Sequence, residues 1–146
     1  MENNEIHRKY AVNQFNLVWE LLDKETRTPD DDYRMIHAAH SSRFHWGEIG
    51  TELEKERGEW QISRVFSVLN IPEAAMRHAK LCMNICRDNN IKDFDIAFAY
   101  EAMARANKIA GDQPESTKYK ELAEEAAEGI EDTEDKDYFL SELKTI

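Results

Sequence analysis

The sequence predicts an all-α fold in which antiparallel helical hairpins stack into an α-α superhelix. Apolar residues recur at helical spacing along nearly the whole chain, and no stretch alternates apolar and polar residues as a half-buried strand does. Glycine and proline are rare, at 5 and 3 of 146 residues, and each proline stands where a helix can begin. Short loops favour antiparallel neighbours. A closed helical bundle is the alternative architecture.

Start and stop signals set the expected helices. Thr28 before Pro29 is an N-cap followed by proline at the first helical position, and the aspartates at 30–32 place negative charge at the positive end of the helix dipole. Proline and glutamate at 72–73 and 114–115 repeat this signal, and Gly111 marks a stop. The six to seven helices are expected at residues 6–22, 29–49, 60–69, 72–89, 93–110, 114–129 and 134–143.

A single domain is expected over residues 1–146, because this length is typical of one domain. Residues 1–50 form an N-terminal helical hairpin in this interpretation, residues 57–130 form two further hairpins, and residues 131–146 form an acidic C-terminal helix. A break is expected at residues 50–58, which Gly50 and Gly58 delimit, with at most a turn of helix inside it.

Composition and charge exclude several classes of function. The chain has no apolar run of about 18 residues, so no membrane span is expected. Its polar first residues do not resemble a secretion signal, which predicts a cytoplasmic protein. The net charge is −11, and residues 121–146 hold ten acids against two bases. Such a surface repels phosphate backbones, so nucleic acid is not expected as a partner.

A repeat can be read in the middle of the chain. Trp60 and Phe94 lie 34 residues apart, which is the period of the tetratricopeptide repeat. Each is followed by an isoleucine, a small residue and an aromatic: Ile62, Ser63 and Phe66 in one copy, and Ile96, Ala97 and Tyr100 in the other. Residues 57–130 therefore resemble two tetratricopeptide-like hairpins. The resemblance implies a superhelix whose first helices line a concave groove.

Six residues are expected to face that groove. They are Arg57, Trp60, Arg64, Phe98, Glu101 and Arg105. Aromatic and arginine side chains commonly anchor bound peptides, so the sequence predicts a protein- or peptide-binding helical-repeat module. The alternative for this set is structural, with Trp60 packed in the core and Arg64 paired with Glu59 or Glu101.

Histidines form the one group that can carry chemistry. His37, His40 and His45 lie close together in the expected helix 29–49. Partial burial with hydrogen bonds across a helix interface is the main interpretation. The alternative is a metal-binding helical-bundle enzyme in which His37 and His40 are joined by His78 or His7. The chain has no triad order, phosphate loop or zincin motif, so neither an enzyme nor a cofactor is expected.

The cysteines, an apolar segment near the C-terminus and three short strings give further expectations. Cys82 and Cys86 share a helix face and are expected to be buried and reduced. The apolar segment 138–140 can dock on a second copy, which predicts a homo-oligomer. The strings HAAHSSRFHWG (37–47), GEWQISRVF (58–66) and DFDIAFAYEA (93–102) are similar to a family of short bacterial proteins with no assigned activity.

Overall fold

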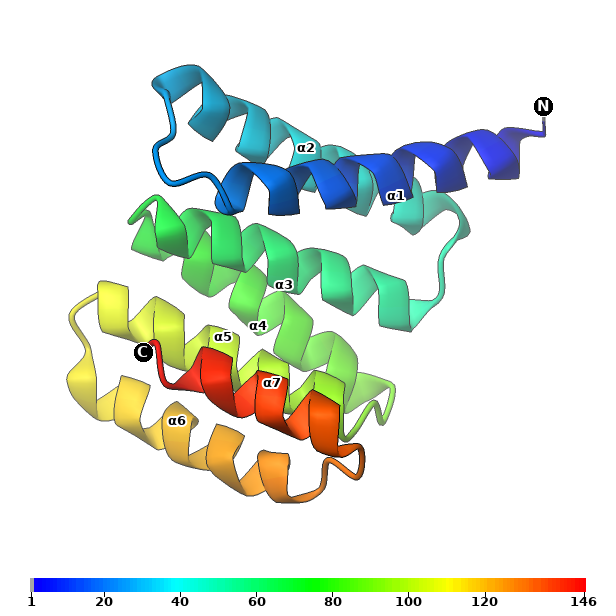
Figure 1. Cartoon of the computed structure of the whole chain (residues 1–146). Helices are drawn as coiled ribbons and strands as arrows, with labels where there is room; N and C mark the ends of the chain where they lie inside the picture. Colours follow the sequence, from blue (N-terminus) through cyan, green and yellow to red (C-terminus); the bar gives the residue numbers. More distant parts are fainter. Residues whose placement is uncertain (1) are drawn as a thin grey trace.

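Seven α-helices and no strand make up residues 2–146, which are the residues that the structure, a computed structural model, describes. The helices are α1 (Asn3–Leu22), α2 (Pro29–Ile49), α3 (Glu52–Val68), α4 (Pro72–Asp88), α5 (Phe94–Ile109), α6 (Gln113–Glu128) and α7 (Thr133–Leu143) (Figure 1). Each helix packs on the next one in the chain. The predicted all-α superhelix of antiparallel hairpins is therefore confirmed. Within the described range, no helix combines the length and apolarity that crossing a bilayer requires.

A buried hydrogen bond of one kind, which we call the serine fastening, joins the two helices of each of the three hairpins. Its donor is a serine hydroxyl on one helix, and its acceptor is an alanine carbonyl oxygen on the partner helix. The pairs are Ser42 to Ala11 at 2.7 Å, Ser63 to Ala75 at 2.8 Å and Ser116 to Ala104 at 2.9 Å. Small residues at these positions let the two helix axes approach closely, and the hydroxyl finds a partner without entering solvent.

Helices α3, α4 and α5 end in the same way. The second residue after each helix lies in the left-handed backbone region, with φ of 59° at Asn70, 54° at Asn90 and 84° at Gly111. The next backbone N–H then reaches back to a carbonyl oxygen five residues earlier, at 2.8–3.0 Å. This is the Schellman motif, in which glycine or asparagine is the preferred left-handed residue. Of these three helix ends, only the one at Gly111 was predicted as a clear stop from the sequence.

Helix α3 begins earlier than the sequence predicts. Residues 50–58 were expected to form a break, but α3 starts at Glu52, after a capping box in which Thr51 and Glu54 bond reciprocally. Gly58 lies inside the helix. A Cβ there would stand 2.9 Å from Cδ of Arg43, so this glycine allows α2 and α3 to approach closely rather than ending a helix.

This longer α3 changes the register of the repeat. A shift by the tetratricopeptide period would place the turn that follows α3 inside α5, so the predicted register of the two copies is wrong. When the α3–α4 and α5–α6 hairpins are aligned by their serine fastenings instead, Ser63 aligns with Ala104 and Ala75 aligns with Ser116. The same register superimposes the first residue of α4 on the first residue of α6. The two hairpins are therefore equivalent, but over a longer period than the sequence analysis assumed.

The C-terminal helix folds back over the last hairpin. Helix α7 packs on both α5 and α6 (Figure 1). Phe139 is fully buried there, beside Phe98, Ala123 and Ala127. The apolar side of α7 is thus used largely within the chain. Docking of this segment on a second copy remains a prediction.

Candidate binding groove

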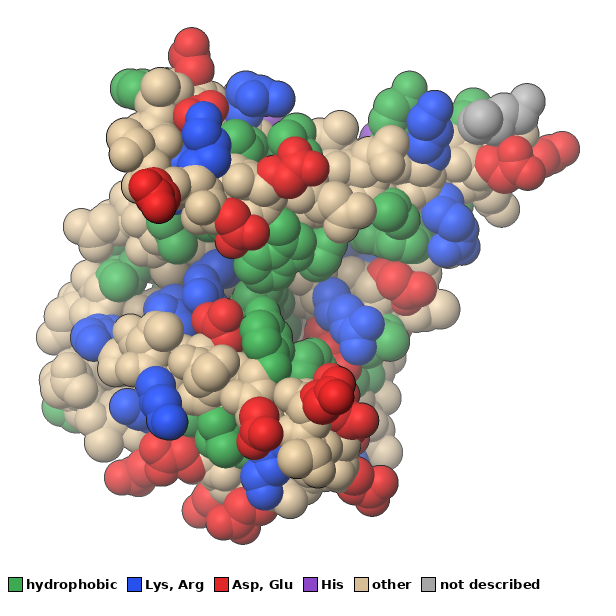
Figure 2. Space-filling model, in the orientation of Figure 1, with side chains coloured by type: hydrophobic (Ala, Val, Ile, Leu, Met, Phe, Trp, Pro, Cys, Tyr) green, Lys and Arg blue, Asp and Glu red, His purple; other side chains and the backbone are tan. Residues whose placement is uncertain are grey.

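A cavity of about 560 Å³ lies on the face of the superhelix that α1, α3, α5 and α7 form. Figure 2 shows this face with a hollow between α1 and α7, hydrophobic side chains on its walls and charged side chains around it. We call the cavity the open end of the groove. Its lining consists of Phe15 and Trp19 of α1, Glu56, Arg57 and Trp60 of α3, Lys92 and Asp93 before α5, Phe94, Asp95 and Phe98 of α5, and Asp135 and Tyr138 of α7.

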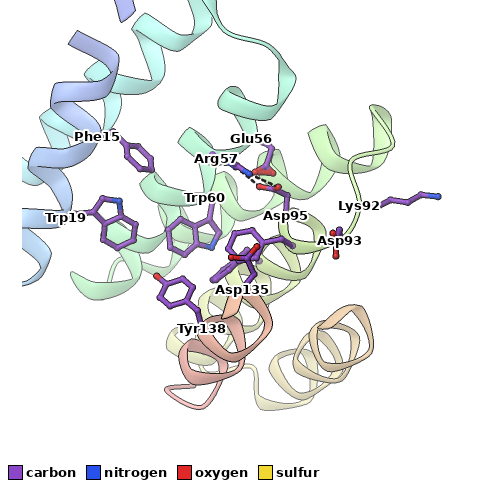
Figure 3. Close-up of a pocket in the computed structure, with 12 residues that line it drawn as sticks. Phe15, Trp19, Glu56, Arg57, Trp60, Lys92, Asp93, Asp95, Asp135 and Tyr138 are labelled. Atoms are coloured by element: carbon purple, nitrogen blue, oxygen red, sulfur yellow. Dashed lines mark hydrogen bonds and ion pairs between the residues drawn. The ribbon is translucent and has the colours of Figure 1, made fainter. Parts of the chain in front are cut away.

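Aromatic rings cross the open end from α1 to α7 (Figure 3). The ring centroids of Trp19 and Trp60 are 5.8 Å apart, and Trp60 meets Phe98 edge to face at 5.4 Å. The ring centroids of Phe98 and Tyr138 are 5.9 Å apart. Tyr138 is 47% exposed, so this end of the row of rings is open to solvent. Rings held by one another in this way present a large contact area with little side-chain entropy left to lose on binding.

A paired arginine and a neutral carboxyl stand beside these rings. Arg57 donates two parallel hydrogen bonds to Asp95, at 2.8 and 3.0 Å, as the dashed lines of Figure 3 show. Burial, and then the charge of Asp95, raise the pKa of Glu56 to about 11, so this carboxyl carries a proton at neutral pH. The bidentate pair fixes both of its side chains and leaves an arginine edge at the cavity wall.

The backbone is strained at one point of the wall. Asp93 has φ of 67°, a left-handed value that a residue with a Cβ seldom adopts. Its side chain makes no capping bond to α5, although it precedes the first helical residue. Strained backbone of this kind is concentrated at functional sites. Asp93 and Asp135 thus add two exposed carboxylates to the rim.

The other part of the groove is filled by the chain itself. Glu101, only 1% exposed, accepts hydrogen bonds from Trp60 at 3.2 Å, Arg64 at 3.2 Å and Arg105 at 2.9 Å. Arg64 also bonds to Glu142 of α7 at 2.7 Å. Arg105 bonds to the backbone oxygen of Glu142 and to the hydroxyl of Thr145. We call Arg64, Glu101, Arg105 and Glu142 the closed end of the groove.

The six residues predicted for the groove divide between these two ends. Arg57, Trp60 and Phe98 line the cavity, whereas Arg64, Glu101 and Arg105 bond to one another and two of them to α7. The Arg64–Glu101 pair is the one that the structural alternative named. The prediction missed the walls from α1 and α7. The signal for them was aromatic residues on helices that precede and follow the repeat, namely Phe15, Trp19 and Tyr138.

The histidines lie elsewhere, on α1, α2 and α4. His7, the other ligand named for His37 and His40, lies instead beside His45, with their Nδ1 atoms 2.9 Å apart. The rings of His40 and His78 are 5.5 Å apart, and Nδ1 of His78 lies 2.8 Å from a carboxylate oxygen of Glu59. Partial burial, and then His78, lower the pKa of His40. Within residues 2–146, one group of three His, Cys, Asp or Glu ligand atoms lies mutually within 4.8 Å, and it is not the predicted set of His37, His40 and His78.

The predicted burial of the cysteines is confirmed. Cys82 and Cys86 are both buried and neither forms a disulfide. Together with Glu56 they form the group of three ligand atoms just described. Glu56 was not predicted as a site residue, because it fell inside the expected break at residues 50–58.

Comparisons with known proteins identify no relative. The chain matches no protein-family model, no curated protein and no solved structure. The geometry of the groove is therefore the basis on which a function can be argued.

Proposed function

We propose that this protein is a helical-repeat binding module whose open end receives a peptide segment of a partner protein. The observation that carries the proposal is the row of aromatic rings from Trp19 to Tyr138, which borders a cavity of about 560 Å³. Clusters of tryptophan and tyrosine beside an arginine are typical of residues that dominate binding energy at protein interfaces. Helical superhelices use this concave face for recognition.

The chemistry of the cavity defines the segment that it suits. The rings favour an aromatic or aliphatic anchor side chain, because apolar contact area is what they offer. The rim adds the exposed carboxylates of Asp93 and Asp135, and the chain carries a net charge of −11. Lysine or arginine residues flanking the anchor would be steered toward such a surface.

The test selects peptides against the full chain. A library of random peptides displayed on phage is panned on the immobilised protein, and enriched peptides are measured by calorimetry. We expect an aromatic or aliphatic residue next to basic residues in the enriched set. Binding should weaken as salt rises, because the flanking contacts are electrostatic. The Tyr138→Ala variant should lose at least about tenfold in affinity, the loss expected of a residue that anchors a bound peptide.

A matched control separates the groove from the rest of the surface. Tyr33 on α2 is 63% exposed and does not line the cavity, so Tyr33→Ala should leave the affinity unchanged. If no peptide is enriched above the background of bare support, the proposal fails. It also fails if the two tyrosine variants bind the enriched peptides equally well.

A further inference from the structure

Three side chains of metal-ligand type meet in the interior behind the groove. Glu56 comes from α3, and Cys82 and Cys86 come from consecutive turns of α4. One ligand atom from each lies within 4.8 Å of the other two, and all three residues are buried. The Cys86 thiol donates a hydrogen bond to a carboxyl oxygen of Glu56 at 3.0 Å.

Packing alone does not require these residue types. The register that superimposes the serine fastenings of the two hairpins places Glu56, Cys82 and Cys86 on Ala97, Ala123 and Ala127. The three alanines are likewise buried, with at most 1% exposure, and they lie in one cluster. The same positions of the same architecture are therefore filled by methyl groups in the second hairpin. Where a chain departs from the simplest local solution, function is the usual reason.

The carboxyl of Glu56 lacks the cationic partner that a buried carboxylate normally has. Among residues 2–146 no lysine or arginine forms an ion pair with it, because the nearby Arg57 is committed to Asp95. Burial raises the pKa of Glu56 and holds the proton on the acid. A buried acid that lies against two thiols can exchange its proton for a metal cation, which supplies the missing positive charge.

We propose that Glu56, Cys82 and Cys86 form a binding site for one thiophilic divalent cation of the zinc type. Two sulfur ligands and one oxygen ligand suit zinc, which prefers four ligands in a tetrahedral arrangement. Glu56 also lines the cavity. Figure 3 shows Asp95 beside Glu56, paired with Arg57.

Binding exchanges protons for the ion without any change of oxidation state. The cation enters as its hydrated form and releases water. The carboxyl and the two thiols each give up one proton, so that up to three protons leave as one divalent ion binds. Affinity should therefore rise steeply with pH. This exchange is independent of whether the groove binds a peptide.

Cobalt(II) provides a direct test with the untagged, reduced, chelator-treated full chain. Cobalt bound by thiolates in a tetrahedral site absorbs in the near ultraviolet through sulfur-to-metal charge transfer and in the visible through ligand-field bands. We expect both features to saturate at one equivalent and to disappear when zinc is added. Cys86→Ala should weaken binding by at least about a hundredfold, since even outer partners of metal ligands cost 10–100-fold.

Variants drawn from the second hairpin keep the test interpretable. Glu56→Ala, Cys82→Ala and Cys86→Ala introduce the residues that the equivalent positions already carry, and circular dichroism checks that the fold is retained. His40→Ala should leave cobalt binding unchanged, whereas its loss in this variant would move the metal to the histidines and overturn the proposal. Absence of thiolate–cobalt absorption in the reduced full chain would also overturn it, as would full binding by Cys86→Ala.

Discussion

Helices α3, α5 and α7 contribute similar side chains to the open and closed ends of the groove, yet the two ends differ in what occupies them. Each contains an arginine from α3, an acid from α5 and aromatic rings near both. At the closed end α7 supplies Glu142 and covers the buried charges. At the open end α7 contributes only its exposed Tyr138 and Asp135. The closed end, which the chain itself fills, thus stabilises the fold, whereas the open end leaves a surface available for contact.

The strongest test of this contrast removes the centre of the closed end. Glu101→Ala leaves Arg64 and Arg105 poorly paired in a largely buried setting, since their side chains are 16% and 14% exposed. We expect a loss of about 3–5 kcal/mol in the free energy of unfolding, the usual cost of breaking a buried charge pair. Urea denaturation measures it. A loss below about 1 kcal/mol would mean that the closed end does not stabilise the fold.

The second test loosens the cover itself. Phe139→Ala removes a fully buried ring from the contact of α7 with α5 and α6, at a cost of about 3 kcal/mol. Hydrogen exchange should accelerate chiefly in α7, because local detachment costs less than global unfolding. The exchange rates of α1 and α2 provide the internal control. Equal acceleration in all helices would show that α7 does not open as a separate unit.

The third test addresses the buried carboxyl of Glu56 beside the open end. The pKa of Glu56 is about 11 in the folded chain against an ordinary value of 4.5, so the native state holds the proton more tightly than the unfolded state does. This contribution to stability is fully present below about pH 4.5 and is lost progressively as pH rises toward 11. Glu56→Gln should remove the dependence and raise stability at pH 8 by on the order of 2 kcal/mol.

That measurement requires a chelator, so that no metal binds. The control is Glu142→Gln at the closed end. The carboxylate of Glu142 is paired with Arg64, so this variant should not have a higher free energy of unfolding than the wild type. If the wild type and Glu56→Gln show the same pH dependence between about pH 5 and 9, the carboxyl is not held neutral by its surroundings.

The smallest expected effect on stability belongs to the open end. Tyr138→Ala truncates a residue that is 47% exposed, so the free energy of unfolding should change by less than about 1 kcal/mol. Thermal denaturation monitored by circular dichroism measures the change. A larger loss would mean that Tyr138 supports α7 in the way Phe139 does, and the contrast between the two ends would lose its basis.

The fold was largely predictable because its signals are local. Apolar spacing and caps such as Thr28 and Pro29 identified six of the helices closely. The seventh, α3, was shortened in the prediction because Gly58 normally ends helices, whereas here it makes room for Arg43. That contact lies between residues far apart in the sequence, so no local pattern reveals it. The wrong repeat register followed from the same error.

The candidate site was predictable only in part, for a related reason. Arg57, Trp60 and Phe98 were found because they belong to the repeat itself. Phe15 and Tyr138 reach the cavity from opposite ends of the chain, and only the curvature of the superhelix brings them together. The meeting of Glu56 with Cys82 and Cys86 likewise depends on the register of α3 against α4, which hydrophobic spacing does not define.

The serine fastening has a consequence for how such a chain can change. Its hydroxyl stands on α6 in the last hairpin but on α3 in the hairpin before it, while in these two hairpins the bond joins equivalent places near the turn. The serine can therefore move from one helix to the other through an intermediate sequence with alanine at both positions. That intermediate loses one hydrogen bond but leaves no buried hydroxyl without a partner. A hairpin could thus be duplicated, and serine and alanine could exchange helices in the copy, while the same type of hydrogen bond still holds its two helices together.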